Sequence, residues 1–221
     1  MNSVDFAFGG FFSIGTLSYA WAKLYRKSFL DSNKIEFGDY RYAEDKIYNY
    51  FCYIAGARYA FIDKKIYVYR RNEQSVSNTY RKDGDKDWMR IAQDLQDKID
   101  SLNYEKKQYS QDEIENYESI VAWTIYFAAF FDGKMEYEYS TGKIRAVINL
   151  LKRYASYDLT KKYLKNPLRY TKKIPALSYK IMLGGFAFLM KCNMYVLLSL
   201  GIKLLVDCHI DERLSDTGRK E

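Results

Sequence analysis

The chain has 221 residues, 48% of them hydrophobic and 18% aromatic, which suffices for the core of one domain or one and a half and excludes a disordered chain. An excess of 35 lysines and arginines over 28 acids gives a net charge of +7, which favours an anionic partner such as a nucleotide, a nucleic acid or a phospholipid. The three cysteines, Cys52, Cys192 and Cys208, lack CxxC spacing, and His209 is the only histidine. Zinc sites, disulfide frameworks and histidine-based nucleophilic catalysis are therefore not predicted.

The chain begins with an apolar lead-in over residues 1–14. Asp5 interrupts it and no cleavage motif follows, so we expect no signal peptide. An extended segment or strand is predicted over 17–25, followed by a helical turn over 26–30.

A helix is predicted to begin at Glu44, because apolar residues recur after it at helical spacing. It should run to about Ala55 and end at Gly56. Asp45 then lies in the first turn of this helix.

Two short runs rich in β-branched and aromatic residues follow, over 58–62 and 65–71. The pair Asp63-Lys64 between them suits a tight connection, so two neighbouring strands are predicted. Residues 72–87 are polar and are predicted to form a loop.

Beyond this loop the pattern is helical. One amphipathic helix is predicted from apolar residues at helical spacing, which are Trp88, Ile91, Leu95, Ile99 and Leu102. Ser110 and Glu113 form a capping box that opens a second helix, expected to reach about Phe131 and to end at Gly133. A third helix is predicted over 144–154.

Cations dominate the stretch between Lys143 and Lys180, where Asp158 is the single acid. They include Arg145, Lys152, Arg153, Lys161, Lys162, Lys165, Arg169, Lys172 and Lys173. Two apolar runs follow, over 181–190 and 194–206, and neither has the roughly 20 residues that a bilayer span needs. We expect two helices anchored at the interface of an anionic membrane; alternatively both pack on the core and the cations are solvated. No helix-turn-helix, RNP-type or zinc-knuckle motif supports a nucleic-acid partner.

Four short motifs occur in order near the start of the chain, over 21–30, 35–37, 43–50 and 65–78. In this order and spacing they resemble the second half of the catalytic domain of family-2 glycosyltransferases, the inverting enzymes that assemble bacterial capsule, exopolysaccharide and cell-wall polymers. The resemblance implies an α/β fold class: a truncated GT-A-like (nucleotide-diphospho-sugar transferase) remnant with a few strands, followed by a mainly α-helical C-terminal region.

Three segments are expected on this basis. Residues 1–80 would form the acceptor-side part of the glycosyltransferase domain, and 81–175 a helical region that contains the basic stretch. Residues 176–221 would form amphipathic, membrane-interfacial helices and a polar tail. The expected location is the cytoplasm, on the inner face of the cell membrane.

The resemblance implies that Asp45 is a general base, with Glu44 in support. The reaction would be inverting transfer of a sugar from a nucleotide-diphosphate donor to a polysaccharide or lipid-linked acceptor. A positioned base of this kind contributes a rate factor of about 10² to 10⁴. From the residues alone, the alternative is that both acids merely cap the helix, where acids are common.

Other residues of the motifs are expected to bind substrate. Arg70 and Arg71 could bind the donor diphosphate bidentately while Ser75 orders the loop; alternatively they form a surface pair at a strand end. Trp21 and Lys23 could supply a sugar-stacking platform with a phosphate contact. The alternative is a buried aromatic beside a solvated lysine.

Members of the family also have a nucleotide-binding half, in which an Asp-x-Asp motif holds Mg²⁺ or Mn²⁺ on the nucleotide-sugar. Residues 83–85 match that motif literally, but they lie in a polar loop that leads into a helix, where Asp83 or Asp85 suits a turn or an N-cap better than a metal. We expect no cofactor in this chain, little activity by the chain alone, and a separate N-terminal half as a partner. The alternative function is a non-catalytic, membrane-peripheral helical module that scaffolds polysaccharide-assembly proteins.

Overall fold

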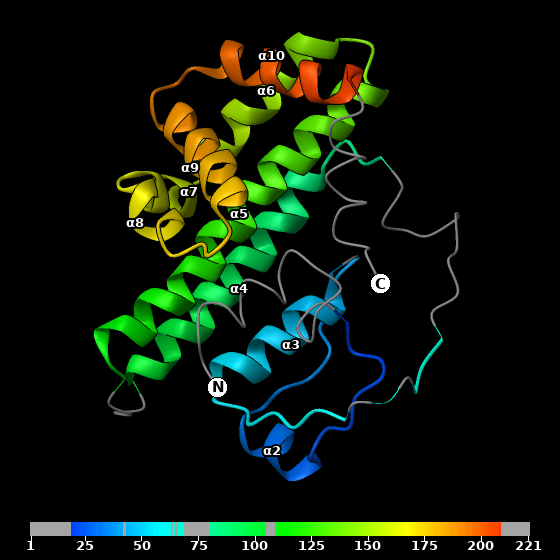
Figure 1. Ribbon diagram of the computed structural model, residues 1–221, viewed down its shortest axis with the longest axis vertical. Coiled ribbons are helices and arrows are strands. Elements are labelled where there is room, and N and C mark those ends of the chain that lie inside the picture. Colours follow the sequence, from blue (N-terminus) through cyan, green and yellow to red (C-terminus); the bar gives the residue numbers. More distant parts are fainter. Residues whose placement is uncertain are drawn as a thin grey trace. The chain divides into compact units, whose positions relative to one another are not determined.

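The computed structural model describes residues 19–41, 43–62, 64, 66–68, 80–104 and 109–208. Within these ranges every regular element is an α-helix, and no strand occurs (Figure 1). The predictions for residues 1–14, Arg70, Arg71, Ser75 and His209 lie outside the described residues.

The helices of the described part of the chain confirm most of the helical predictions. They are α2 (Lys27–Ser32), α3 (Glu44–Ile54), α4 (Gly84–Tyr104), α5 (Gln111–Tyr139), α6 (Lys143–Ser156), α7 (Asp158–Leu164), α8 (Pro167–Thr171), α9 (Leu177–Lys191) and α10 (Tyr195–Asp207). The helical turn predicted over 26–30 is α2, and the helix predicted from Glu44 is α3. The two apolar runs after the basic stretch are α9 and α10.

The expectation of an α/β, GT-A-like remnant is wrong for this chain, because the described residues form an all-α structure. The two runs predicted as strands are irregular over 58–62 and 66–68. A strand is stabilised by pairing with a neighbouring strand, and no described segment supplies one. Phe61, Ile62 and Val68 are accordingly 58%, 69% and 92% exposed.

Contacts along the chain divide it into two compact units. Unit 1 comprises residues 1–79 and 94–117, and unit 2 comprises residues 80–93 and 118–221. The division falls inside α4 and α5, so each of these helices contributes residues to both units.

Unit 1 contains α3 as its most buried helix. The side chains that α3 buries are Ile47, Tyr48, Asn49, Tyr50, Cys52, Tyr53 and Ile54. Tyr48 and Cys52 form an apolar cluster with Ile35, and Phe29 and Leu30 of α2 pack against this cluster. Burial of apolar surface therefore holds α2 and the segment after it on α3.

The amphipathic helix predicted over 88–102 is α4, and its five apolar positions are all buried. The capping box before α5 is also confirmed. The backbone N–H of Ser110 donates to Glu113 Oε2 at 2.9 Å, and the backbone N–H of Glu113 donates to Ser110 Oγ at 3.2 Å. These two bonds satisfy donors that a helix start would otherwise leave unpaired.

The prediction that α5 ends at Gly133 is wrong, because the helix continues to Tyr139. Gly133 is buried where α5 meets α10, and a Cβ at this position would lie 2.9 Å from Cδ1 of Ile202. The glycine therefore permits the close approach of two helices instead of ending one.

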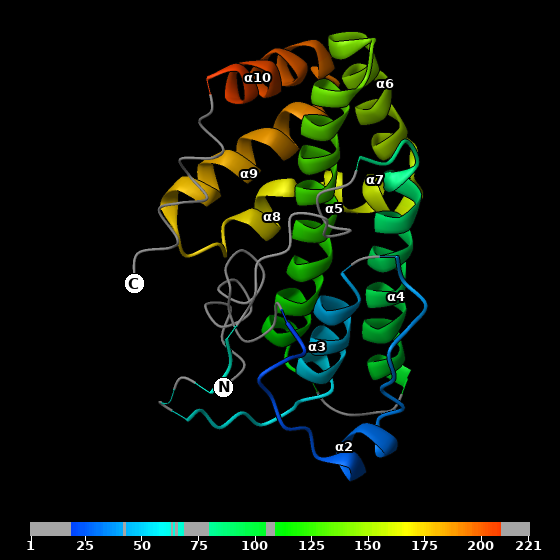
Figure 2. The same ribbon diagram turned by 90° about the vertical axis from the view of Figure 1, so that its right-hand side faces the viewer.

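Unit 2 is organised around its part of α5. The Trp123 indole N–H donates to the carbonyl oxygen of Tyr170 at 3.2 Å, and the Tyr126 hydroxyl donates to the carbonyl oxygen of Tyr163 at 3.0 Å. Both bonds are buried, so they satisfy polar groups that would be costly to leave unpaired. Around this centre α8 packs on α9, and α10 packs on α6 and α9 (Figure 2).

Unit 2 also contains an ion pair between a buried aspartate and an exposed arginine. Asp85, in the first turn of α4, is 1% exposed. Its Oδ1 lies 3.2 Å from Nη2 of Arg153 on α6, and its Oδ2 accepts a hydrogen bond of 3.0 Å from the Tyr157 hydroxyl. Asp83, by contrast, precedes α4 and pairs with Lys86 on the surface. The ion pair between Asp85 and Arg153 ties the start of α4 to α6.

Asp132 on α5 lies in the same polar region and accepts a hydrogen bond from the Tyr154 hydroxyl. Burial raises the pKa of Asp132 to about 7, although the bond from Tyr154 favours the ionised form. The negative charges of Asp85 and Glu136 act in the same direction as burial. Asp132 therefore changes its charge near neutral pH.

Asp132→Asn should remove a pH dependence of stability. Because the pKa of this carboxyl is raised by folding from about 4 to about 7, its neutral form stabilises the folded chain at low pH, and this contribution is lost as the pH rises through about 7. Between pH 5 and pH 8 the free energy of unfolding of the parent should fall by roughly 2–3 kcal/mol relative to the variant. Urea titrations at both pH values measure the difference.

The control is Asp158→Asn, because Asp158 is an exposed acid whose pKa is lowered by its hydrogen bond with Lys161. This variant should keep the fall in stability of the parent between pH 5 and pH 8. Equal pH profiles for the parent and Asp132→Asn would contradict the assignment.

Candidate functional site

The predicted general base lies where it was expected, in the first turn of α3. Glu44 is exposed and Asp45 is half-buried. The N-cap position belongs to Ala43, which has no side-chain hydrogen-bonding group, so neither acid occupies the cap. Both carboxylates lie at the helix end where the backbone dipole favours negative charge.

The segment with Trp21 and Lys23 is joined to α3 by one hydrogen bond, and a second bond within α3 continues from it to the start of the helix. The Tyr25 hydroxyl donates to Oδ1 of Asn49 at 2.9 Å, and Nδ2 of Asn49 donates to the carbonyl oxygen of Asp45 at 2.7 Å. Two motifs that lie about twenty residues apart in the sequence therefore meet at the first two turns of α3.

The short motif over 35–37 also packs on α3. The Phe37 ring stacks on the Tyr48 ring with 4.1 Å between the centroids, and Ile35 is buried beside Tyr48 and Cys52. The Tyr25 ring meets the edge of the same Tyr48 ring at 5.2 Å. Tyr48 belongs to the motif over 43–50 and contacts two other motifs, so three motifs meet at its ring.

Trp21 contacts the fourth motif. Its ring stacks with those of Tyr19 and Tyr67, with centroids 4.7 and 4.6 Å apart, and Tyr67 belongs to the motif over 65–78. Trp21 is half-buried. A sugar that stacked on this indole would compete with these two tyrosines for its faces.

Lys23 is half-buried and lies within electrostatic reach of Asp45. Burial lowers the pKa of Lys23, and the negative charge of Asp45 acts in the opposite direction. The structure thus brings together Lys23 and Asp45, two of the predicted site residues.

Lys46 is a second cation in the first turn of α3, which the sequence interpretation did not single out. Burial lowers its pKa to about 8, so part of the Lys46 population is neutral near physiological pH. The one feature of the sequence that could have indicated a role for Lys46 was its position directly after Asp45. Cys52 is a less reactive group, because burial raises its pKa to about 11.

Two alanines adjoin the predicted site residues in the left-handed region of backbone space. Ala22, between Trp21 and Lys23, has a φ of 57°, and Ala43, directly before Glu44, has a φ of 59°. This conformation costs an L-residue with a Cβ about 1–2 kcal/mol. Such strain collects at functional sites, where the surrounding packing enforces it.

The divalent cation implied by the family resemblance finds no fitting ligands here. In the described ranges, no group of three histidine, cysteine, aspartate or glutamate side chains could hold a metal ion. The literal Asp-x-Asp match does not provide one either, because Asp83 pairs with Lys86 and Asp85 pairs with Arg153. We therefore assign no step of any reaction to a metal held by these residues.

Comparison of the chain with protein-family models, with curated proteins and with solved structures found no match. The chemistry of the site therefore has to be inferred from its own groups. A carboxylate at a helix N-terminus beside two lysines can accept a proton from a hydroxyl group, and the lysines favour an anionic ligand nearby. Arg70, Arg71 and Ser75, the other predicted substrate-binding residues, lie outside the described residues.

Ala43→Gly should stabilise the chain, because glycine adopts the left-handed conformation without the steric cost that alanine incurs. Glycine is also the better N-cap of the two. After subtraction of the larger entropy that glycine has in the unfolded chain, we expect a gain of about 0.5–1 kcal/mol in the free energy of unfolding. Urea denaturation of parent and variant gives this difference.

Ala55→Gly is the matched control at the other end of α3, where φ is −71° and alanine is unstrained. It should be neutral or destabilising. A loss of stability in Ala43→Gly as large as in the control would show that residue 43 is not strained.

Proposed function

We propose that this chain is the acceptor-side part of a glycosyltransferase of cell-surface polysaccharide biosynthesis, acting at the inner face of the cell membrane. The observation that supports the proposal is the convergence of the four family-2 motifs on α3. Tyr25, Ile35 and Phe37 contact α3 directly, and Tyr67 reaches the same region through Trp21. A shared acceptor site would require these motifs to lie together in this way.

In this proposal Asp45 accepts the proton of the acceptor hydroxyl as its oxygen attacks the anomeric carbon of the donor sugar. The new glycosidic C–O bond forms while the bond to the nucleotide diphosphate breaks, and the diphosphate leaves with the bonding electrons. Attack opposite to the leaving group inverts the anomeric centre. Glu44, exposed beside Asp45, is suited to contact acceptor hydroxyls, and Lys23 provides positive charge near the reacting groups.

The nucleotide and its divalent cation are assigned in this proposal to a separate N-terminal half. The exposed apolar side chains over 61–62 and 66–68 are a suitable surface for that partner. Their segments have the composition of strands but no partner strand among the described residues, and Val68 is 92% exposed. Exposed apolar side chains of this kind favour a contact with another protein. Alone, the 221-residue chain should show little transfer.

Asp45→Asn should abolish most of the transfer in an enzyme completed with the nucleotide-binding half. Loss of the base should lower the rate by a factor of about 10² to 10⁴, because asparagine cannot accept the proton. Initial rates of transfer from a radiolabelled nucleotide-sugar to a polymer or lipid-linked acceptor measure the effect. Circular dichroism should show unchanged helix content.

Asp31→Asn is the matched control, because Asp31 is an exposed carboxylate of unit 1 that pairs with Lys27 on the surface. Its rate should equal that of the parent. Retained activity in Asp45→Asn, or efficient transfer by the purified chain without the other half, would contradict the proposal.

A second candidate function is a non-catalytic, membrane-peripheral helical module that scaffolds polysaccharide-assembly proteins. The observation in its favour is the exposed apolar surface of α9 and α10, where Ile181, Val196 and Leu204 are 66%, 59% and 59% exposed. Under this hypothesis changes at Asp45 would have no effect on polymer assembly, whereas changes on α9 and α10 would reduce it.

A further inference from the structure

Helix α9 is apolar on the face that it exposes as well as on the face that it buries. The exposed positions Leu177, Ile181, Gly185 and Phe188 follow one another at spacings of three or four residues, so they form one stripe along the helix. A helix at the surface of a globular protein normally exposes charged and polar residues on this side. The stripe of α9 has none.

Helix α10 repeats the arrangement. Its exposed positions Val196, Leu197, Leu200, Gly201 and Leu204 also form one stripe, whereas Leu198, Ser199 and Ile202 are buried on the opposite side. Both stripes belong to unit 2, in which α9 and α10 contact each other. We call the two stripes together the apolar surface.

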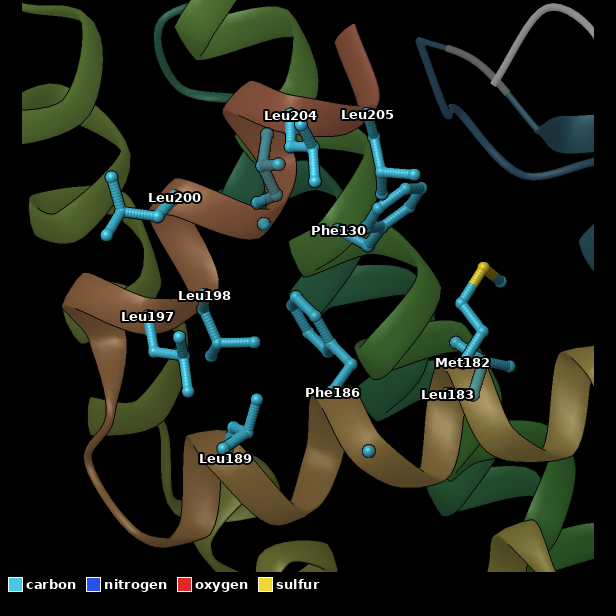
Figure 3. A pocket seen from close by; sticks show the side chains of 13 residues that line it. Phe130, Met182, Leu183, Phe186, Leu189, Leu197, Leu198, Leu200, Leu204 and Leu205 are labelled. Atoms are coloured by element: carbon cyan, nitrogen blue, oxygen red, sulfur yellow. The ribbon is translucent and has the colours of Figure 1, made fainter. Parts of the chain in front are cut away.

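An apolar pocket of about 490 Å³ opens between the two helices and continues the apolar surface. Figure 3 shows Phe186 and Leu189 of α9 and Leu197 and Leu198 of α10 directed toward the space between the helices. All of the side chains that line the pocket lack nitrogen and oxygen atoms. The pocket therefore offers an apolar ligand contact without hydrogen bonds.

Positive charge borders the apolar surface. By helical geometry, Lys180 and Lys191 on α9 and Lys203 on α10 each lie roughly a quarter turn from the stripe of their helix. Residues 159–206 contain nine lysines and arginines and no acid. Lysines at such borders can keep their ammonium groups in water or at phosphates while their methylene chains cover apolar surface.

Neither helix is suited to cross a membrane. α9 has 15 residues and α10 has 13, so their lengths are about 22 and 20 Å, against a hydrocarbon core of about 30 Å. Among the described residues, no helix has the length and apolarity of a bilayer span. Helices too short to span the hydrocarbon core, with lysines at the border of an exposed apolar stripe, can lie in the plane of the interface instead.

We propose that the apolar surface of α9 and α10 docks on an anionic phospholipid bilayer, with both stripes at the boundary of headgroups and acyl chains and the bordering lysines at the lipid phosphates. The pocket between the helices then receives apolar parts of the lipid. This inference deepens the membrane-peripheral part of the proposed function and does not depend on Asp45 as a base.

The charges favour a bilayer over a second copy of the chain as the occupant. In a two-fold symmetric dimer the same surface of both copies meets, which brings the lysines of one copy toward those of the other. Lys203 pairs with Asp207 at the end of α10, but α9 contains no acid that could neutralise Lys180 and Lys191. An anionic lipid surface neutralises Lys180 and Lys191 instead, and each of them contributes about fivefold to the binding constant.

Vesicle co-sedimentation of the full 221-residue chain tests the proposal. The chain should bind vesicles of phosphatidylcholine with phosphatidylglycerol and bind vesicles of phosphatidylcholine alone much less. Binding should weaken when salt is raised from 0.1 M to 1 M, because the Debye length falls from about 10 Å to about 3 Å. No transfer reaction is measured, so failure here is independent of failure at Asp45.

Two double variants test the two parts of the surface. Ile181→Gln with Val196→Gln should weaken binding at least tenfold, because both side chains are more than half exposed in water and enter the lipid. Lys180→Gln with Lys191→Gln should weaken it about thirtyfold, since both lysines border the apolar surface on α9. Circular dichroism verifies that both variants fold.

Matched controls come from exposed residues of unit 1. Leu24→Gln with Val68→Gln removes two apolar side chains that are 101% and 92% exposed. Arg26→Gln with Lys64→Gln removes two exposed cations. Both controls should bind vesicles as the parent does.

A fluorescent probe on Cys192 provides a second measurement. This cysteine is exposed at the end of the α9 stripe, whereas Cys52 is buried, so Cys208→Ser leaves one accessible thiol among the described cysteines. The emission of an environment-sensitive dye on Cys192 should shift to the blue with anionic vesicles. Equal binding by the parent and the Ile181→Gln, Val196→Gln variant would overturn the proposal. The proposal would also be overturned if the parent chain did not bind vesicles but formed a dimer, and if the same double variant dissociated that dimer.

Discussion

The arrangement of the motifs in unit 1 depends on the contacts that they make with the ring of Tyr48. Phe37 stacks on it, Tyr25 meets its edge, and Ile35 is buried beside it. Ring pairs of this kind contribute about 0.5–1.5 kcal/mol beyond the burial of their area. The segments that Tyr25, Ile35 and Phe37 belong to have no helix or strand of their own, so side-chain packing on α3 positions them. The proximity of Lys23 to Asp45 is therefore a product of tertiary packing.

Features that depend on neighbours in the sequence were predictable. The capping box of Ser110 and Glu113, the periodicity of α4 and the place of Asp45 in its helix all follow from local rules. The strands were mispredicted because a strand also needs a partner from elsewhere in the chain. The end of α5 was mispredicted because Gly133 is required by its close contact with Ile202, which lies about seventy residues away in the sequence. At the candidate site, the burial of Lys46 and the strain at Ala43 likewise depend on contacts that no local pattern encodes.

The exposed stripes of α9 and α10 are not explained by the stability of unit 2. Helices of this length are marginal in isolation, so the buried faces that pack on α6 and α8 are what stabilise them. Leucine, isoleucine and valine side chains on the opposite faces gain nothing from folding while they remain in water, and polar residues there would preserve the same packing. Their presence on both helices, without one charged residue in either stripe, is therefore best explained by a contact outside the folded chain.

The transfer reaction proposed for Asp45 also requires groups that stabilise the leaving diphosphate, beyond the groups described here. Removal of a proton accounts for only part of the acceleration in a group transfer, because charge that develops on the leaving diphosphate has to be stabilised as well. Lys23 and Lys46 lie on the acceptor side of the proposed reaction, next to the base. Burial lowers the pKa of Lys46, which favours the neutral form of its amino group. The positive charges of Lys23 and Lys46 beside Asp45 favour a substrate with negative charge over a neutral one.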